Sequence, residues 1–320
     1  MGVRRFGHRG QLERPTRIFP FFALVLLLPG WADAQYAFRD LDVDFQGRRG
    51  ALYGCAATGI SDAGMIVGAC NDANRDNTSR GFLYDGRRFA DVYFPTVKGE
   101  SSVASYQDAP FRRMPLLTRV SGVVPQDVNS ALDVTGWYQQ FGLQGFLTRH
   151  GRVSNINVPD SLLTEALGIN DAGHVVGDYR SADGVFHGFL LANGVFTTFG
   201  NDLGADDINN AGQIVGCYAT CSRGFLNNGS TFTSIDVPGA TVTQVRGLND
   251  TGQIVGVYFD GATLRGFIYD GTGFEAIEVP GAYSTAVNGI NNEGVIVGSY
   301  VIALPSGGFE QRAFVATRGE

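Results

Sequence analysis

The stretch that decides the fold reads Gly247-Leu-Asn-Asp-Thr-Gly-Gln-Ile-Val-Gly-Val-Tyr258, followed by Arg265-Gly-Phe-Ile-Tyr-Asp270 and Phe274-Glu-Ala-Ile-Glu-Val-Pro280. The chain contains six copies of this phrase, with the turn position occupied in order by Gly64, Leu132, Gly173, Gly212, Gly252 and Gly294. These positions are separated by 68, 41, 39, 40 and 42 residues. The repeat is therefore about 40 residues long, and one connection, at 96–123, carries an insertion of roughly 27 residues.

Each copy divides into four short extended pieces, which in the fifth copy are 241–249, 253–258, 266–270 and 274–279. β-Branched and aromatic residues fill these pieces, and Asn-Asp-x-Gly or Asp-Gly-x-Gly separates them. Glycine in such a turn supplies the positive φ that a tight hairpin needs. Because the rest of the chain shows no helical periodicity, four strands per repeat predict the blade of a β-propeller.

The two ends of the repeat predict how the ring closes. The sixth copy stops after its third strand, at 313–317, and lacks the fourth piece of the other copies. A piece of that type stands near the beginning of the chain as Phe38-Arg-Asp-Leu-Asp-Val43. We therefore expect an all-β, six-bladed β-propeller of four-stranded blades in which the N-terminal strand completes the last blade. A β-solenoid is the alternative, but an open stack needs no displaced first strand.

The first 34 residues have the pattern of a secretory signal peptide. Five arginines precede the apolar run Phe21-Phe-Ala-Leu-Val-Leu-Leu-Leu28, and the small-residue site Ala32-Asp-Ala34 follows it. The run is shorter than the ~20 residues of a membrane span, which argues against the alternative of an uncleaved anchor helix. We expect cleavage after Ala34 and one propeller domain over 35–320, located in the periplasm or outside the cell.

Without residues 1–34, the chain keeps 19 basic and 29 acidic residues, a formal charge of −10. Its single lysine is Lys98. An acidic surface repels the phosphate backbone, so no nucleic-acid partner is expected. No second long apolar run follows residue 34, and we expect a monomer without a membrane span.

Four cysteines in an exported chain predict two disulfides, and the phase of the repeat chooses among the three connectivities. If residues 61–64 form a hairpin turn, the numbers of cross-strand partners sum to 125, which places Cys55 opposite Cys70. Cys217 and Cys221 lie together where another strand pair turns. The expected bridges are therefore Cys55–Cys70 and Cys217–Cys221. A metal site is the alternative, but neither pair has the spacing that zinc prefers.

Four phrases in fixed order carry a family resemblance: Gly-Ile-Asn-Asp-Ala-Gly, Gln-Ile-Val-Gly, Gly-Phe-Leu-Tyr-Asp and Ile-Asp-Val-Pro-Gly. They resemble the bacterial extracellular repeats of the HAF family, over nearly the whole chain after residue 34. The second copy departs from the pattern, because Asn129-Ser-Ala-Leu132 replaces the Asn-Asp-x-Gly turn. The resemblance implies secretion and a repeat fold, and it supplies no catalytic residues.

Positions that recur in every copy are expected to be structural. Aliphatic residues recur in register where blades stack on each other, at Ile169, Ile208, Leu248, Ile290, Val215, Val255 and Val297. The turn asparagines are expected to cap their own turns through side-chain to backbone hydrogen bonds, at Asn170, Asn209, Asn249 and Asn291.

Ligand-specific residues are expected where the copies differ. The connections between second and third strands, and the insertion at 96–123, vary freely and emerge on one face of the ring, which we call the variable face. Three residues before the turn asparagine, or before Ser61 in the first copy, the inner strands carry a ring that is polar apart from Leu167. Its polar members, the candidate ligand-binding residues, are Thr58, Gln126, Asp206, Arg246 and Asn288. We expect them near the channel mouth on the variable face.

One loop has the oxygen spacing of a calcium site. Asp72, Asn74 and Asp76 alternate along it, as ligands do in a calcium loop. Glycine is absent from the sixth position and Leu83 stands at the twelfth, so a solvated loop is the alternative reading. Ca²⁺ is the one cofactor that the sequence raises.

Sequence signatures of catalysis are absent. Beyond residue 34 the histidines are His150, His174 and His187, none at metal-ligand spacing, and there is no Gly-x-Ser-x-Gly elbow or phosphate-binding glycine loop. The sequence therefore favours a secreted, non-enzymatic propeller that binds a glycan, a peptide or a partner protein. The alternative is an extracellular hydrolase or lyase acting on a polysaccharide, with carboxyl groups such as Asp206 and Glu165 at the channel.

Overall fold

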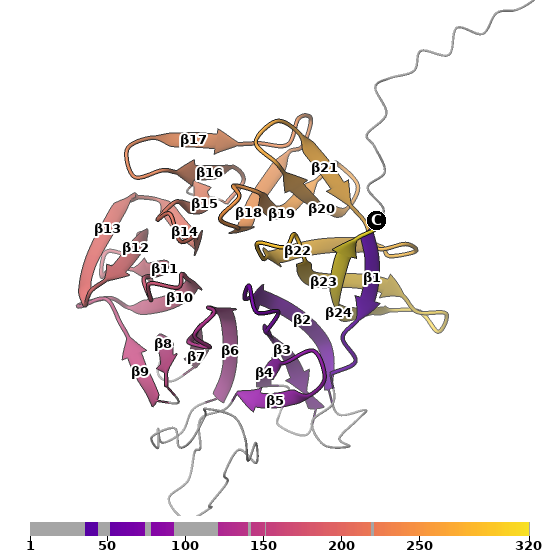
Figure 1. Ribbon diagram of the computed structural model, residues 1–320, viewed down its shortest axis with the longest axis horizontal. Helices are drawn as coiled ribbons and strands as arrows, with labels where there is room; N and C mark the ends of the chain where they lie inside the picture. Colours follow the sequence, from indigo (N-terminus) through magenta and orange to yellow (C-terminus); the bar gives the residue numbers. More distant parts are fainter. Residues whose placement is uncertain are drawn as a thin grey trace, which may run out of the picture. The chain divides into compact units, whose positions relative to one another are not determined.

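The computed structural model describes residues 36–43, 52–73, 78–92, 121–139, 142–150, 152–218 and 221–319. Over these ranges the chain forms 24 β-strands and no α-helix. The strands make six four-stranded antiparallel sheets, which stand as blades around a ring (Figure 1). The predicted six-bladed β-propeller is confirmed. The proposed signal peptide at 1–34 and most of the insertion at 96–123 lie outside the described residues.

The first three blades follow one another along the chain, each with its inner strand first. Blade one comprises β2 (Leu52–Ile60), β3 (Ile66–Asp72), β4 (Thr78–Tyr84) and β5 (Phe89–Val92). Blade two comprises β6 (Ser121–Val128), β7 (Val134–Gln139), β8 (Leu143–Arg149) and β9 (Arg152–Ile156). Blade three comprises β10 (Leu163–Ile169), β11 (Val175–Arg180), β12 (Phe186–Ala192) and β13 (Val195–Asn201).

The remaining blades continue the same order until the last. Blade four comprises β14 (Leu203–Ile208), β15 (Ile214–Tyr218), β16 (Gly224–Asn227) and β17 (Phe232–Ile235). Blade five comprises β18 (Val242–Leu248), β19 (Ile254–Phe259), β20 (Leu264–Tyr269) and β21 (Phe274–Ile277). Blade six comprises β22 (Ser284–Ile290), β23 (Ile296–Ala303), β24 (Phe309–Arg318) and, as its outer strand, β1 (Tyr36–Asp40).

The pairing of β1 with β24 confirms the predicted closure of the ring. The two strands are antiparallel, with Tyr36 opposite Arg318 and Asp40 opposite Phe314 (Figure 1). The strand begins two residues earlier than the sequence pattern indicates and ends at Asp40. Leu41 and Val43 then leave the sheet and are buried in a core cluster shared with blade one. The segment therefore joins the last blade to the first by packing as well as by pairing.

Each blade is built around one glycine and one phenylalanine that lie directly opposite each other on its second and third strands. The six pairs are Gly68–Phe82, Gly136–Phe146, Gly177–Phe189, Gly216–Phe225, Gly256–Phe267 and Gly298–Phe314. All six phenylalanines are fully buried. A Cβ on the glycine would meet both the ring and a carbonyl oxygen of the inner strand, 2.0 Å away in the case of Gly256. The recurring glycine is therefore required by close packing.

The turn asparagines do more than cap their own turns. Asn249 Oδ1 accepts a hydrogen bond from the backbone N–H of Gln253 at 2.9 Å, which confirms the predicted cap. Its Nδ2 also donates to the carbonyl oxygen of Asn291 in the next blade, at 3.0 Å. The same bond to the next blade is donated by Asn129, Asn170, Asn209 and Asn291. These asparagines tie successive inner strands together around the ring.

Leu132 takes the place of glycine in the turn of blade two. Its φ is 63°, close to the φ of 74° at Gly173 in blade three. The hairpin keeps its geometry there, because Asn129 Oδ1 still accepts from the N–H groups of Ala131 and Asp133. The departure in sequence therefore leaves the fold of this turn unchanged.

Both predicted disulfides are present. Cys55 and Cys70 join β2 to β3, with Cα atoms 4.0 Å apart. Cys55 lies in an irregular part of β2, between the paired residues Tyr53 and Ala56. Cys217 and Cys221 join the end of β15 to the connection that follows it, with Cα atoms 4.8 Å apart. A search of the described residues finds no helix long and apolar enough to cross a membrane.

Candidate functional site

The inner strands of all six blades line a cavity of about 460 Å³. One end is formed by residues of the short turns between first and second strands: Asp62, Ser130, Asp171, Asn210, Asp250 and Asn292. Toward the other end its wall includes Cys217, Cys221, Ser299 and Gln311. The cavity therefore follows the axis of the ring and has a polar wall along its length.

The turn end of the cavity is a belt of alternating carboxylates and hydrogen-bond donors. Asn292 Nδ2 donates to Asp62 Oδ2 at 2.7 Å and to Asp250 Oδ2 at 2.8 Å. Asn210 Nδ2 donates to the same oxygen of Asp250 at 2.8 Å. These bonds lower the pKa of Asp250, although its partial burial acts in the opposite direction. The carboxylates at this end are thus held by protein donors.

All five candidate ligand-binding residues of the polar ring line this cavity: Thr58, Gln126, Asp206, Arg246 and Asn288. The sequence therefore identified residues that the fold brings together from five different blades. Each lies three positions before the first residue of a turn, which is Ser61 in blade one and asparagine in the others. Leu167 is the apolar member of the ring from blade three.

Three members of the ring also connect neighbouring blades. Thr58 Oγ1 donates to the carbonyl oxygen of Pro125 at 2.8 Å. Asn288 Nδ2 donates to the carbonyl oxygen of Ala57 at 2.7 Å, which links blade six to blade one. Arg246 Nη1 donates to Asn288 Oδ1 at 2.6 Å. These side chains are fixed before any ligand arrives.

Gln126 and Asp206 make no side-chain hydrogen bond to any residue in the part of the chain that the structure describes. Both are half-buried, because they face the cavity and are enclosed by protein elsewhere. Burial raises the pKa of Asp206 to about 7; the nearby Arg246 lowers it and Glu165 raises it further. The Asp206 carboxyl group thus faces the polar cavity and is available to bind a ligand.

Two aspartates that the sequence analysis did not identify, Asp127 and Asp207, are part of the same wall. Asp127 Oδ2 accepts from the N–H of Ile169 at 3.0 Å, and Asp207 Oδ2 accepts from the N–H of Leu248 at 2.9 Å. Each bond crosses to the next blade. Burial raises the pKa of Asp127 to about 7 and raises that of Asp207 as well.

A comparison of the six copies of the repeat could have identified these two aspartates. The equivalent position is glycine in the other four blades, at Gly59, Gly168, Gly247 and Gly289. A Cβ on Gly59 would lie 2.6 Å from Asp127 Oδ1, and one on Gly168 would lie 2.7 Å from the Cα of Asp207. Each aspartate therefore occupies space that the preceding blade leaves open by having glycine.

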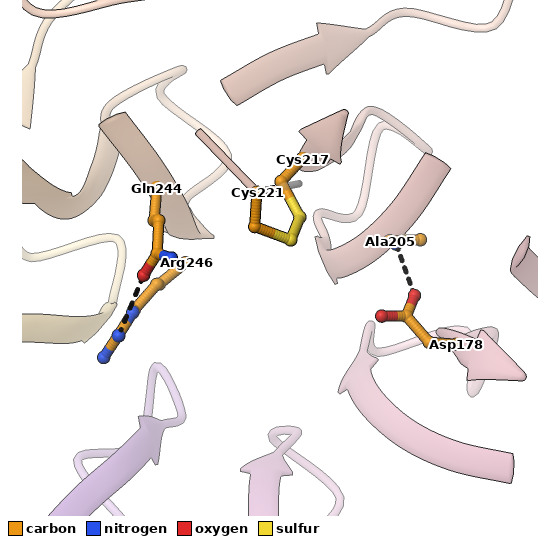
Figure 2. Close-up of a disulfide and its surroundings, with 6 residues drawn as sticks. All are labelled: Asp178, Ala205, Cys217, Cys221, Gln244 and Arg246. Carbon is orange, nitrogen blue, oxygen red and sulfur yellow. Dashed lines mark hydrogen bonds between the residues drawn. A yellow bond between two sulfur atoms is a disulfide. The ribbon is translucent and has the colours of Figure 1, made fainter. Parts of the chain in front are cut away.

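Glu165 and Asp178, on blade three, lie close enough to Asp206 for their charges to interact with it. They lie directly opposite each other on β10 and β11. Asp178 Oδ1 accepts from the N–H of Ala205 at 2.8 Å (Figure 2). Burial raises the pKa of both groups, and for Asp178 the charges of Asp206 and Glu165 add to the rise. Neither residue is among those that line the cavity.

The Cys217–Cys221 disulfide forms part of the cavity wall. Figure 2 shows it between the strand that carries Gln244 and Arg246 and the strand that carries Asp178. Sequence reasoning predicted the bridge but not its place at the cavity. Cys221 has a φ of 48°, a conformation typical of tight turns.

The proposed calcium loop is only partly described. Asp72 is buried at the end of β3, and Arg80 Nη1 donates to its Oδ2 at 3.5 Å. Arg80 Nε also donates to Asp91 Oδ2 at 3.0 Å. Asn74 and Asp76 lie outside the described residues, so the calcium site stays a prediction.

Two aromatic side chains are exposed near the variable face. Tyr283, just before β22, is 56% exposed, and Phe309, at the start of β24, is 63% exposed. Their ring centroids are 5.1 Å apart. This pair adds an apolar spot beside connections that differ from blade to blade.

Comparison with known proteins finds similarity in fold only. No family model matches the chain, and no curated protein matches it. A streptogramin B lyase has 9% identity and a TM-score of 0.46, over 89% of this chain and 98% of that one. The Aleuria aurantia lectin in complex with α-methyl-L-fucoside has 13% identity and a TM-score of 0.46, over 82% and 93% of the two chains. The β-propeller domain of the Trilobed protease from Pyrococcus furiosus has 11% identity and a TM-score of 0.48, over 83% and 93%.

Proposed function

We propose that this protein is an exported, non-enzymatic binding protein that holds a small polar ligand in the axial cavity. One observation carries the proposal: five polar side chains from five blades converge on a cavity of about 460 Å³. That volume lies in the range of roughly 300–1,000 Å³ typical of small-molecule sites. Most of the wall is fixed by hydrogen bonds, while Asp206 and Gln126 keep free polar atoms for a ligand.

Export and family membership belong to the same proposal. The N-terminal pattern at 1–34, the two disulfides and the acidic composition support a periplasmic or extracellular protein. The repeated phrases support membership of the HAF family. The variable face would admit the ligand and supply additional contacts to a glycan or peptide, with the pair Tyr283 and Phe309 at its edge.

The alternative, a hydrolase or lyase acting on a polysaccharide, has less support. A carboxyl pair that cleaves a glycosidic bond must reach the same substrate from both sides. Asp206 lines the cavity together with five other aspartates, whereas Glu165 and Asp178 are not among the lining residues. The raised pKa of Asp206 would suit a general acid. The other five aspartates of the wall already accept hydrogen bonds from protein donors, which does not favour them as the second catalytic carboxyl group.

The test is a binding and turnover screen of the purified protein. Sugars, oligosaccharides, peptides, amino acids and polyamines are titrated by calorimetry, and the same compounds are followed for cleavage products. We expect saturable binding that Asp206→Asn weakens and that Glu275→Gln, on the outer strand β21, leaves unchanged. Cleavage that Asp206→Asn abolishes would establish the enzymatic alternative. Binding that is insensitive to every cavity substitution would place the ligand elsewhere.

A further inference from the structure

Arg246, a base, and Asp206, an acid, occupy equivalent positions of adjacent inner strands, β18 and β14, and yet form no ion pair. Arg246 donates from Nη1 to Asn288 Oδ1 at 2.6 Å and from Nη2 to Gln244 Oε1 at 3.3 Å. Asp206 is close enough for its charge to act on Arg246, but no nitrogen–oxygen distance between the two is within 4.0 Å. The two charges face the same cavity without touching.

The neutral side-chain amides of Asn288 and Gln244 hold Arg246 apart from Asp206. Asn288 is itself fixed, because its Nδ2 donates to the carbonyl oxygen of Ala57 at 2.7 Å, which turns its Oδ1 toward Arg246. Gln244 lies two residues before Arg246 on the same strand, so both side chains project from one face (Figure 2). Together the two amides hold the guanidinium on the side of blade six, away from Asp206.

Both charges keep unused bonding capacity. A guanidinium has five N–H donors, and the two amides occupy two of them. The Asp206 carboxylate accepts no hydrogen bond among the described residues. The charged groups that act on Asp206 are Arg246, Glu165, Asp178 and Asp207, of which three are acidic. A cation beside Asp206 would therefore be favoured, and an anion would be favoured only beside Arg246.

We infer that Arg246 and Asp206 form a split recognition site for a small zwitterion, such as an α-amino acid or a short peptide. The carboxylate of the ligand binds the free N–H groups of Arg246, and its ammonium group binds Asp206. This inference rests on the proposed function and names the class of its ligand.

Other ligand classes satisfy the site less well. A simple anion would bind Arg246 but would face the six aspartates of the cavity wall: Asp62, Asp127, Asp171, Asp206, Asp207 and Asp250. A simple cation would bind Asp206 and leave Arg246 as a like charge beside it. A neutral sugar would leave both charges without a charged partner. A zwitterion adds no net charge and supplies a charge-assisted hydrogen bond to each group.

The rest of the ring can discriminate among zwitterions. Leu167 lies beside Asp206 in the order of the blades and offers an apolar contact, whereas Gln126 offers an amide. The side chain of the ligand would therefore meet blades two and three. This arrangement favours a medium-sized apolar or amide-bearing side chain over a charged one.

The test is calorimetric titration of the full mature protein with the twenty amino acids and with dipeptides. For each zwitterion that binds, its N-acetyl derivative, which lacks the ammonium group, and its amide, which lacks the carboxylate, are measured too. We expect capping at either end to weaken binding at least tenfold. Asp206→Asn should weaken the zwitterion but change the N-acetyl derivative little, and Arg246→Gln should weaken the zwitterion but change the amide little.

Controls separate the possible failures. Glu275→Gln should bind like the parent, and circular dichroism melting shows that each variant is folded. Saturable binding of a neutral sugar or of putrescine, with none by amino acids or dipeptides, would overturn the zwitterion assignment and leave the proposed function standing. The absence of saturable binding by every compound, in a protein that is folded, would overturn both. Equal binding by capped and uncapped forms would also overturn the assignment.

Discussion

The hydroxyl group of Tyr300 donates a hydrogen bond of 2.7 Å to Asp40 Oδ1, which joins residues 260 positions apart. Tyr300 lies on β23 and Asp40 ends β1, so the bond crosses β24 within the last blade. The closure of the ring thus includes side chains as well as the ladder between β1 and β24. The first prediction tests the contribution of this closure to stability.

Removing residues 36–43 should destabilise the whole ring, because it exposes the edge of β24 and opens a core cluster. Leu41→Ala is the smaller test, since Leu41 is buried, and it should lower the free energy of unfolding by about 2–5 kcal/mol. Chemical denaturation monitors both. Ala37→Ser, at an exposed position of β1, should change little. A deletion variant that melts like the parent would disprove the role of this strand.

The two disulfides should differ in their contribution to stability. The Cys55–Cys70 bridge spans 15 residues, for which the loss of chain entropy in the unfolded state predicts up to about 3 kcal/mol. The Cys217–Cys221 bridge spans only 4, for which the same relation predicts about 2 kcal/mol. Paired serine substitutions, compared by denaturation, measure both values. Replacing Cys217 and Cys221 should also change ligand affinity, because they line the cavity. Free thiols in the purified protein would contradict the assignment.

Gly256→Ala should destabilise blade five severely. The new Cβ would lie 2.0 Å from the carbonyl oxygen of Gln244 and 2.9 Å from the ring of Phe267, and backbone cannot move aside as a flexible side chain can. We expect a loss of about 3 kcal/mol or more in the free energy of unfolding. Gly273→Ala is the matched control, since nothing lies within 4 Å of its Cβ position, and it should change stability by less than about 0.5 kcal/mol. Similar losses for both would show that the packing argument is wrong.

Stability should fall as the pH rises from 5 to 8. Burial raises the pKa of Asp127 from 3.8 to about 7, so the folded state prefers the protonated acid. Stability from such a group is complete below the unfolded pKa and is lost as the pH rises through the folded pKa. For Asp127 alone, linkage gives a loss of about 2–3 kcal/mol between pH 5 and pH 8.

Asp127→Asn tests this dependence, because it removes the titrating group. Thermal melts of the parent and the variant across pH 5–8 should show a flatter profile for the variant. Groups with a lowered pKa, such as Asp260 and Asp270 at about 2, lose their contribution only at lower pH and leave this window unaffected. An unchanged profile in Asp127→Asn would show that this carboxyl group is ionised in the folded protein.

The sequence predicted the ring because a blade must repeat in order to stack. The turn position predicted the register of each hairpin, and that register alone predicted the Cys55–Cys70 bridge, although Cys55 lies in an irregular part of β2. The displaced piece at 38–43 identified the closing strand. The same regularity located Thr58 and Asn288 on the channel wall, although they are far apart in the chain.

Contacts between blades were harder to predict. Arg246 lies 40 residues after Asp206 and 42 before Asn288, so spacing gives no preference between these two neighbours. The choice depends on Gln244 and Asn288, whose amides hold the guanidinium in place. The hydrogen bonds of Asp127 and Asp207 to the next blade likewise depend on glycine in the preceding one, a relation that a single repeat does not contain.

The closure has a consequence for how the protein is made. Among the described strands, β1 emerges first from the ribosome, and its partner β24 emerges last. Five blades can assemble in order during synthesis, but the sixth cannot pair with its outer strand until β24 has been synthesised. Pairing over such a sequence distance is slow, and an unpaired edge meanwhile offers a template to other chains. The last blade is therefore complete only when β1 and β24, at opposite ends of the described chain, have paired.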